Sequence, residues 1–271
     1  MLLDYYNDPH TYSNTDTVKI THIHLELDVD FEHQVLKGHA ILHLNKEKDC
    51  KELILDTWGL HIYKTAVGHE NQETHFSLGE HDELLGAPLS VEIEENTEIV
   101  TIYYTTSPNA KALQWMLATD ISNKHLLFSQ SQAILARSWV PLQDSPSVRF
   151  TYNASITVPT GYLPLMSAEN PAELREDNKY MFKMEQAIPS YLLAIAVGNF
   201  VFQPLGDRTG VYAEPNLIEA SAWEFADMQK MLEAGEALYG AYRWDRYDVL
   251  VLPGSFPFGG MENPRLTFAT P

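Results

Sequence analysis

The sequence is poor in cysteine and in basic residues, and it has no long apolar run. Cys50 is the only cysteine among 271 residues, so the chain cannot close an internal disulfide or build a cysteine-based metal site. Basic residues number 18 against 37 acidic ones, and the resulting net charge of −19 disfavours nucleic acid and anionic membranes as partners. The longest apolar run, 191–197, is far shorter than the roughly 18 residues that a membrane span needs. Residues 1–10 lack the basic and apolar regions of a signal peptide, so we expect a cytoplasmic protein.

The first three quarters of the chain alternate between apolar and polar residues. The hydrophobic fraction of 45% and the charged fraction of 20% are those of a folded globular protein. From Lys19 to about Phe202 the apolar residues recur at every second position, which predicts strands with one face on a core. The strand-like segments are 23–31, 40–44, 53–55, 99–104 and 148–158, with 191–197 as a central strand buried on both faces. No helix is predicted before residue 205, so this part is interpreted as an all-β layer structure.

The pattern changes near residue 205. Residues 203–216 are rich in glycine and proline, and the apolar spacing that follows is helical. Ser221 and Glu224 form a capping-box pattern that predicts a helix ending at Gly240, and Tyr247–Leu252 follows as a buried strand. We therefore expect a β domain over residues 1–205 and a helix-and-strand unit over 206–271, which is too short to bury a core of its own.

Pro253–Pro271 combines a glycine-rich loop with an acidic residue. Gly259 and Gly260 can adopt positive φ values and let a ligand approach the backbone closely. Glu262 then follows at a rigid position, and a fixed carboxylate in a partly desolvated cleft can select substrates by their free terminal ammonium group. On pattern alone, a solvated glutamate on a surface turn remains the alternative.

The segment 259–263 (GGMEN) resembles the GxMEN motif of the gluzincin zinc aminopeptidases, the family of aminopeptidase N and leukotriene-A hydrolase. Further segments resemble the leukotriene-A hydrolase branch of that family: 112–115, 128–134, 144–148, 255–258 and 264–268. The resemblance implies a mainly β fold, with a saddle-like antiparallel sheet domain over residues 1–205. Residues 206–271 would then begin a thermolysin-like α/β catalytic domain and leave it incomplete.

The resemblance also implies roles for individual residues. Glu262 would bind the α-ammonium group of the substrate, and the backbone of Gly259 and Gly260 would lie along the peptide. Gln132, with Gln130 as its neighbour, would reach the S1 subsite, and period two would place both on one side of a strand. The candidate substrate-binding residues are Gln130, Gln132, Pro257, Phe258, Gly259, Gly260, Met261, Glu262 and Asn263.

Two departures from the family pattern limit these expectations. Phe258 stands where the leukotriene-A hydrolase branch has tyrosine, which makes epoxide hydrolysis less favoured. No HExxH motif occurs, and no histidine follows His125, so zinc ligands and the general base are expected beyond Pro271. The pairs His39/His43 and His22/His24 share outward strand faces, where solvated histidines are the ordinary interpretation. We expect no catalytic residue, metal ligand or cofactor within this chain.

The sequence thus supports one main hypothesis and two alternatives. The main one is the N-terminal region of a zinc aminopeptidase that removes N-terminal residues from peptides with a free N-terminus. The remainder of its own catalytic domain would be its partner, and zinc would belong to the complete enzyme, so this chain alone would be inactive. The first alternative is a non-catalytic β module that binds peptide, glycan or protein. The second, a bifunctional epoxide hydrolase and aminopeptidase, is disfavoured by Phe258.

Overall fold

The computed structural model describes residues 8–116 and 124–270. The chain forms two compact units, and neither is continuous in sequence. The first consists of Met1–Gln114, Ser129–Thr157 and Lys183–Leu193, and the second of Trp115–Phe128, Val158–Phe182 and Ala194–Pro271. The units are described one at a time, and the domain boundary near residue 205 stays a prediction.

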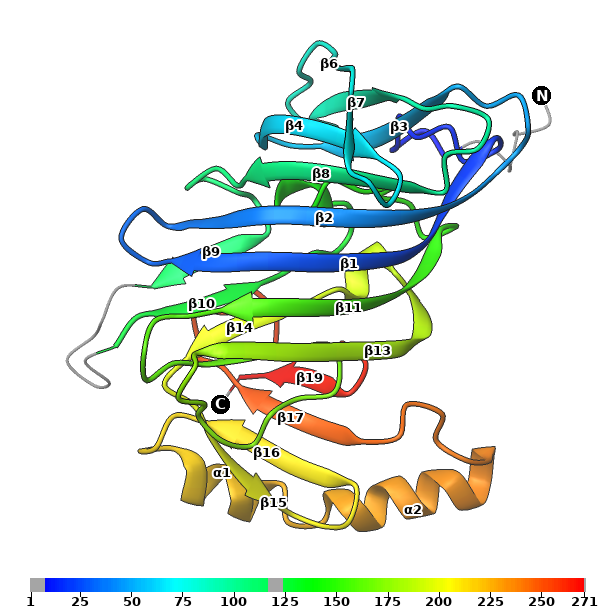
Figure 1. Cartoon of the computed structure of the whole chain (residues 1–271). Coiled ribbons are helices and arrows are strands. Elements are labelled where there is room, and N and C mark those ends of the chain that lie inside the picture. The colour runs from blue at the N-terminus through cyan, green and yellow to red at the C-terminus, as the bar shows by residue number, and fades with distance from the viewer. Residues whose placement is uncertain (1–7, 117–123, 271) are drawn as a thin grey trace. The chain divides into compact units, whose positions relative to one another are not determined.

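The first unit is built on a seven-stranded sheet (Figure 1). Its strands, in spatial order, are β13 (Lys179–Pro189), β11 (Arg149–Thr157), β1 (Val18–Asp30), β2 (Val35–Lys46), β8 (Ile99–Thr105), β4 (His61–Val67) and β5 (Gln72–Thr74). A three-stranded sheet has the order β3 (Glu52–Thr57), β7 (Ala87–Glu92) and β6 (Phe76–Leu78). Strands β1 and β2 are antiparallel, but β1 and β11 are parallel, a pairing that the sequence pattern did not reveal.

Buried apolar and outward polar side chains alternate along β1, so one face of the large sheet packs on the core. Ile23, Leu25 and Leu27 are at most 2% exposed, whereas His22 and His24 lie on the opposite face. Period two therefore correctly identified the buried face of this strand. Burying side chains of this size contributes roughly 1.5–3 kcal/mol each, which makes the sheet face the main source of stability in this part.

A buried ion cluster joins distant segments of the first unit. Arg137, in the short 3₁₀ helix η1 (Ala136–Ser138), is 1% exposed. Its Nε donates to Asp144 Oδ2 at 3.1 Å, and its Nη1 lies 3.7 Å from Asp56 Oδ1. Asp144 also accepts a 2.5 Å hydrogen bond from Ser190, and Asp56 accepts one of 2.8 Å from the Tyr12 N–H. Burial raises the pKa of the Asp144 carboxyl, and Arg137 and Ser190 counteract that shift by stabilising its ionised form.

Removing Arg137 should therefore be costly. We expect Arg137→Met in the full-length protein to lower the free energy of unfolding by about 3–5 kcal/mol, because two buried carboxylates lose their cation. Chemical denaturation followed by circular dichroism measures the change. Arg175→Met is the control, since the Arg175–Asp177 pair is exposed and its loss should have little effect. Equal denaturation midpoints for the two variants would contradict a structural role of the cluster.

The second unit contains two further sheets. The four-stranded one has the order β12 (Leu163–Met166), β14 (Ile195–Gly198), β10 (Leu126–Ser129) and β9 (Leu113–Met116). The five-stranded one has the order β15 (Val201–Pro204), β16 (Thr209–Ala213), β17 (Tyr247–Val251), β19 (Leu266–Ala269) and β18 (Gly260–Met261). The expected central strand over 191–197 is thus shorter than predicted, because η2 (Ser190–Leu192) takes up its beginning and only β14 lies between two neighbours.

Two helices, α1 (Ile218–Glu224) and α2 (Met228–Tyr239), take the place of the single helix predicted from Ser221. The capping-box interpretation is wrong, because Ser221 lies inside α1 and its N–H bonds to the Leu217 carbonyl at 2.9 Å. The predicted end at Gly240 is confirmed: this residue has a φ of 91° and its N–H caps the Glu236 carbonyl.

The helices lie along one face of the five-stranded sheet (Figure 1). Alternate residues of β16 and β17 form a small core with Met228 of α2: Val211, Ala213, Val249 and Val251. Strand β17 runs parallel to both β16 and β19, so the centre of this sheet is of the α/β kind. The mainly β fold, with the first helix and strand elements of an α/β unit at its end, is confirmed.

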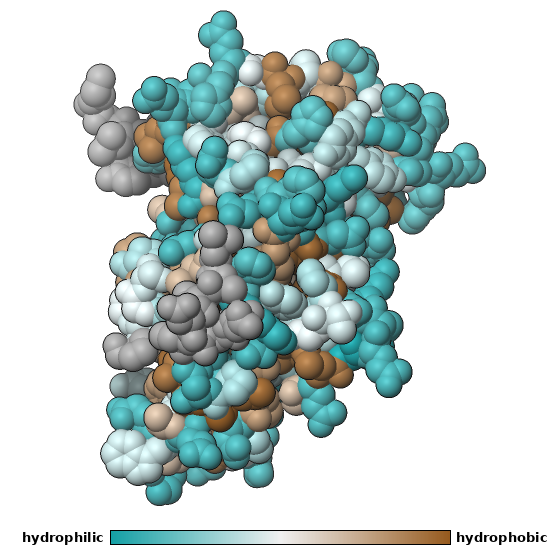
Figure 2. All heavy atoms as spheres, turned by 90° about the vertical axis from the view of Figure 1, so that its left-hand side faces the viewer, coloured by the Kyte–Doolittle hydropathy of each residue, from teal (hydrophilic) through white to brown (hydrophobic). Residues whose placement is uncertain are grey.

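The surface is dominated by polar side chains on the face that Figure 2 shows, with smaller apolar patches between them. In the part of the chain that the structure describes, no helix combines the length and the apolar character needed to cross a membrane.

Candidate functional site

The segment 253–263 leaves the central strand β17 and reaches the edge strand β18. Phe256 is 4% exposed, and its ring packs edge-on against Phe128 and Phe268, with centroid distances of 5.5 and 5.9 Å. Phe258 is 50% exposed, with its ring centroid 6.4 Å from that of Phe256. The buried phenylalanine thus fixes the start of the loop, while Pro257 and Phe258 remain on the surface.

The two glycines do not use the left-handed conformations expected of them. Neither Gly259 nor Gly260 has a positive φ value. Gly260 instead begins β18 and pairs with Ala269, and a Cβ at this glycine would lie 3.1 Å from the carbonyl oxygen of Phe268. The requirement for glycine here comes from close packing between strands rather than from a turn. Because β18 ends the sheet, its outer edge has no partner strand among the described residues.

Glu262 directly follows β18. Its neighbours Met261 and Asn263 are each 3% exposed, which fixes the backbone, whereas the Glu262 side chain is exposed. Within the described residues this carboxylate makes no hydrogen bond or ion pair, and the buried Nδ2 of Asn263 also lacks a hydrogen-bond partner. The buried neighbours therefore fix the backbone at Glu262, while its carboxylate stays in solvent. The partly desolvated surroundings expected for this carboxylate are not found within the described residues of the second unit.

The two candidate glutamines belong to the first unit, and their expected shared strand face is wrong. Strand β10 ends at Ser129, and Gln130 and Gln132 lie in the turn that follows it. Gln130 is 8% exposed, whereas Gln132 is exposed, and the Gln132 N–H bonds back to Gln130 Oε1 at 2.9 Å. The buried Nε2 of Gln130 has no hydrogen-bond partner in the described structure. Among residues 8–116 and 124–270, this donor is left without an acceptor.

Ser131, between these glutamines, holds the turn in place. Its hydroxyl donates to the Leu193 carbonyl at 2.9 Å and accepts the indole N–H of Trp139 at 3.1 Å. The Gln130 N–H also donates to the Ala112 carbonyl at 2.7 Å. Sequence reasoning missed this serine, because its partners lie 8 and 62 positions away and no local pattern marks them.

The histidines of β1 and β2 gather on the polar face of the large sheet. His22 packs edge-on against His43 at 5.3 Å, and His24 Nε2 lies 3.4 Å from Glu26 Oε1. Burial lowers the pKa values of His39 and His43, which favours their neutral forms. Across residues 8–116 and 124–270, no three His, Cys, Asp or Glu side chains are arranged to hold a metal ion. The zinc that the resemblance implies thus has no ligand set in the described chain.

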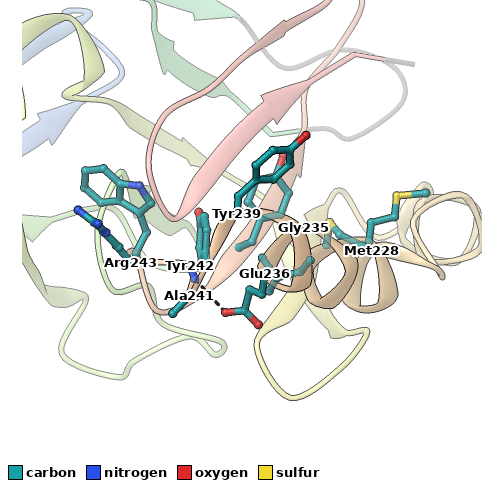
Figure 3. Close-up of a pocket in the computed structure, with 12 residues that line it drawn as sticks. Met228, Gly235, Glu236, Tyr239, Ala241, Tyr242 and Arg243 are labelled. Atoms are coloured by element: carbon teal, nitrogen blue, oxygen red, sulfur yellow. Dashed lines mark hydrogen bonds between the residues drawn. The ribbon is translucent and has the colours of Figure 1, made fainter.

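A hollow of about 530 Å³ opens beside α2, at a place that the sequence did not single out (Figure 3). It is lined by Met228, Met231, Leu232, Gly235, Glu236, Tyr239, Gly240, Ala241, Tyr242, Arg243, Trp244 and Tyr247. None of the candidate substrate-binding residues is among them. Two of the lining residues, Met231 and Tyr239, are 70% and 89% exposed, and the nearby Leu238 is 75% exposed. They form an apolar helix face that the described part of the chain leaves exposed.

Glu236 is the acidic residue in the lining of this hollow. Its carboxylate accepts hydrogen bonds from Arg208 Nη2 at 2.6 Å and from the Tyr242 N–H at 2.9 Å, the second of which is drawn in Figure 3. The hydrogen bonds from Arg208 and Tyr242 lower the pKa of Glu236 from 4.5 to about 2. Burial raises the pKa of Tyr242 to about 12, so its phenol stays protonated at neutral pH.

This shift predicts a specific dependence of stability on pH. Because the pKa of Glu236 is lowered by folding, its contribution is complete above pH 4.5 and disappears as the pH falls towards 2. We expect the melting temperature of Glu236→Gln to lie below that of the parent at pH 6, with the gap closing between pH 4.5 and 2. Glu173→Gln, at an exposed residue, is the control. A gap of constant size down to pH 2 would contradict the assignment.

Comparison with known proteins identifies the family to which this chain belongs. Residues 6–192 match the peptidase M1 N-terminal domain, and the chain belongs to the peptidase M1 family. The chain is 41% identical over 277 residues to leukotriene A-4 hydrolase of Xenopus laevis, and 40% identical over 272 residues to leucine aminopeptidase 2 of Yarrowia lipolytica. Each alignment covers 97% of this chain.

Solved structures agree with this assignment. The chain superposes on native yeast LTA4 hydrolase with a TM-score of 0.91 and 33% identity, covering 99% of this chain and 43% of that one. The same enzyme in complex with bestatin gives a TM-score of 0.91 at 33% identity, with 100% of this chain and 43% of that chain covered. The chain spans 45% of the length of the Xenopus relative and 41% of the Yarrowia relative, in each case its N-terminal part.

Proposed function

We propose that this chain is the N-terminal part of a zinc-dependent aminopeptidase that removes N-terminal residues from peptides. The observation that carries the proposal is the position of Glu262, an unengaged carboxylate that directly follows an edge strand with a free outer side. Membership of the M1 family, with a leucine aminopeptidase among the relatives, supports it.

The geometry suits recognition of a peptide by its first residue. An extended peptide can add to the outer edge of β18 through backbone hydrogen bonds, which do not depend on its sequence. Glu262 would meet the α-ammonium group where the peptide begins, and an internal residue has no such charge to offer. Gly259 and Gly260 would let the peptide approach the backbone closely. For Gln130 and Gln132, the proposed contribution to the S1 subsite rests on the family resemblance.

The reaction requires groups that this chain does not contain. The donor set for zinc does not exist among the described residues, so we derive no step through the metal and place its ligands and the general base in the remainder of the protein. The uncovered face of α2, with Met231, Leu238 and Tyr239, supports a larger catalytic domain as the partner of this chain. We also propose a cytoplasmic location, which fits a single buried cysteine.

Phe258 is relevant to epoxide hydrolysis, because one relative is named leukotriene A-4 hydrolase. At this exposed position the side chain offers an apolar ring and no hydroxyl group. We therefore propose peptide hydrolysis without epoxide hydrolysis as the activity of the complete protein.

The role of Glu262 can be tested in the full-length protein. Replacing Glu262 with Gln removes the negative charge and keeps the size of the side chain. Loss of one partner from a desolvated charge pair costs on the order of 2–5 kcal/mol, so kcat/KM for a leucyl nitroanilide should fall by about 10²-fold or more.

Glu173→Gln, a change at an exposed residue of the same unit, is the matched control and should leave kcat/KM unchanged. An unaltered kcat/KM in the Glu262 variant would refute its role as the amine anchor.

Zinc dependence gives an independent test. The full-length protein should lose peptidase activity on dialysis against a chelator and regain it with zinc, whereas residues 1–271 alone should show no turnover with or without zinc. Metal analysis of both preparations accompanies the assay. A full-length protein that binds peptide but shows no metal-dependent turnover would instead favour the non-catalytic binding module.

A further inference from the structure

An arginine occupies an unfavourable backbone position three residues after Glu262. The Leu266 N–H bonds to the Asn263 carbonyl at 3.2 Å and closes a turn with Pro264 and Arg265 at its centre. Arg265 has a φ of 65°, and a turn with proline first and a positive φ second normally places glycine or asparagine there. The backbone alone therefore gives no reason for arginine at this position.

The side chain of Arg265 supplies the reason. It is only 8% exposed, and its Nη2 donates to Asp245 Oδ2 at 3.1 Å. Asp245 precedes β17, and it too has a positive φ, of 70°. The ion pair thus joins two residues that both have a left-handed backbone conformation. One lies in the turn after β18 and the other in the turn before β17.

Backbone contacts show that these two turns adjoin. The carbonyl of Arg265 accepts the N–H of Asp248 at 3.4 Å, and Asp248 is in register with Leu266 where β17 and β19 begin. Asp248 in turn pairs with Arg246 at 2.8 Å. The turn that follows Glu262 is therefore held from one side by contacts to the connection before β17: the Arg265–Asp245 ion pair and the backbone hydrogen bond from Asp248.

This connection also lines the hollow beside α2. Tyr242, Arg243 and Trp244 border that hollow, and Asp245 comes directly after them. The buried Nε of Arg265 has no hydrogen-bond partner among the described residues, and the side-chain hydrogen bond that the guanidinium makes there goes to Asp245. Asp245 thus orients the Arg265 side chain, and the pair connects the turn after Glu262 to the connection before β17.

We propose that Arg265, through its ion pair with Asp245, is a positioning residue that sets where Glu262 meets the substrate ammonium group. This inference rests on the proposed aminopeptidase function and extends it to a residue outside the glycine-rich loop. Arg265 itself touches no substrate. It holds the Asn263–Leu266 turn against the connection before β17, and Glu262 is the residue immediately before that turn.

Arg265→Gly in the full-length protein isolates the side chain, because glycine suits the positive φ and leaves the turn intact. A displaced amine anchor weakens ground-state and transition-state binding alike, so KM for a leucyl nitroanilide should rise about tenfold with kcat nearly unchanged.

Asp245→Asn should also raise KM, and Arg265→Lys should raise it less than Arg265→Gly does. The double variant Asp245→Arg with Arg265→Asp reverses the pair and should bring KM back to within about threefold of the parent value.

The variant with the reversed ion pair shows whether Arg265 positions Glu262 or only stabilises the fold. A KM within about twofold of the parent in both Arg265→Gly and Asp245→Asn would overturn the inference. So would a loss of kcat and melting temperature together without rescue by the reversed pair. Glu262→Gln is measured in the same assay to separate the two proposals. If Glu262→Gln raises KM and Arg265→Gly does not, only the positioning role of Arg265 is refuted. If Glu262→Gln has no effect, the proposed function itself is refuted.

Discussion

The first unit depends on one buried guanidinium that satisfies groups from four parts of the chain. Arg137 contacts two carboxylates, Asp144 and Asp56, and donates to the carbonyl oxygens of Leu85 and His10. Each of these groups would be costly to bury alone, so the loops that carry them are stable only when assembled around the same cation. The glutamine turn lies a few residues before Arg137 in sequence and is held by the hydrogen bonds of Ser131.

Charge acts differently in the second unit. There the Arg208–Glu236, Arg246–Asp248 and Arg265–Asp245 pairs lie around the ends of the five-stranded sheet and are all partly exposed. Each pair links a strand end or connection to a residue distant from it or to the neighbouring strand residue, and so orients the connections beside the sheet. The apolar core beneath α2 is small, so these pairs have more influence on the loops than packing has.

Much of the fold could be predicted from the sequence, because periodicity is a local property. The buried face of β1 and the end of α2 at Gly240 both follow from residues within one turn or strand. The break between α1 and α2 could not be predicted, because the apolar spacing continues across Phe225–Asp227 while the helix does not. The turn at Gln130 and Gln132 was missed for a related reason: alternation cannot show that Ser129 is the last residue paired in a strand.

The candidate site shows the same limit at the scale of single residues. A motif locates Glu262, Gly259 and Gly260, but it does not say that Gly260 lies in a strand, close to the Phe268 carbonyl, instead of in a turn. Arg265 illustrates the reverse case, since Pro264 predicts a turn, whereas the positive φ at the next position normally requires glycine or asparagine and not arginine. Only the position of Asp245, 20 residues earlier, resolves that contradiction. An unfavourable backbone conformation that is stabilised by a distant partner marks a place where the fold holds a loop at the cost of local strain. Here that loop follows the carboxylate on which the proposed function depends.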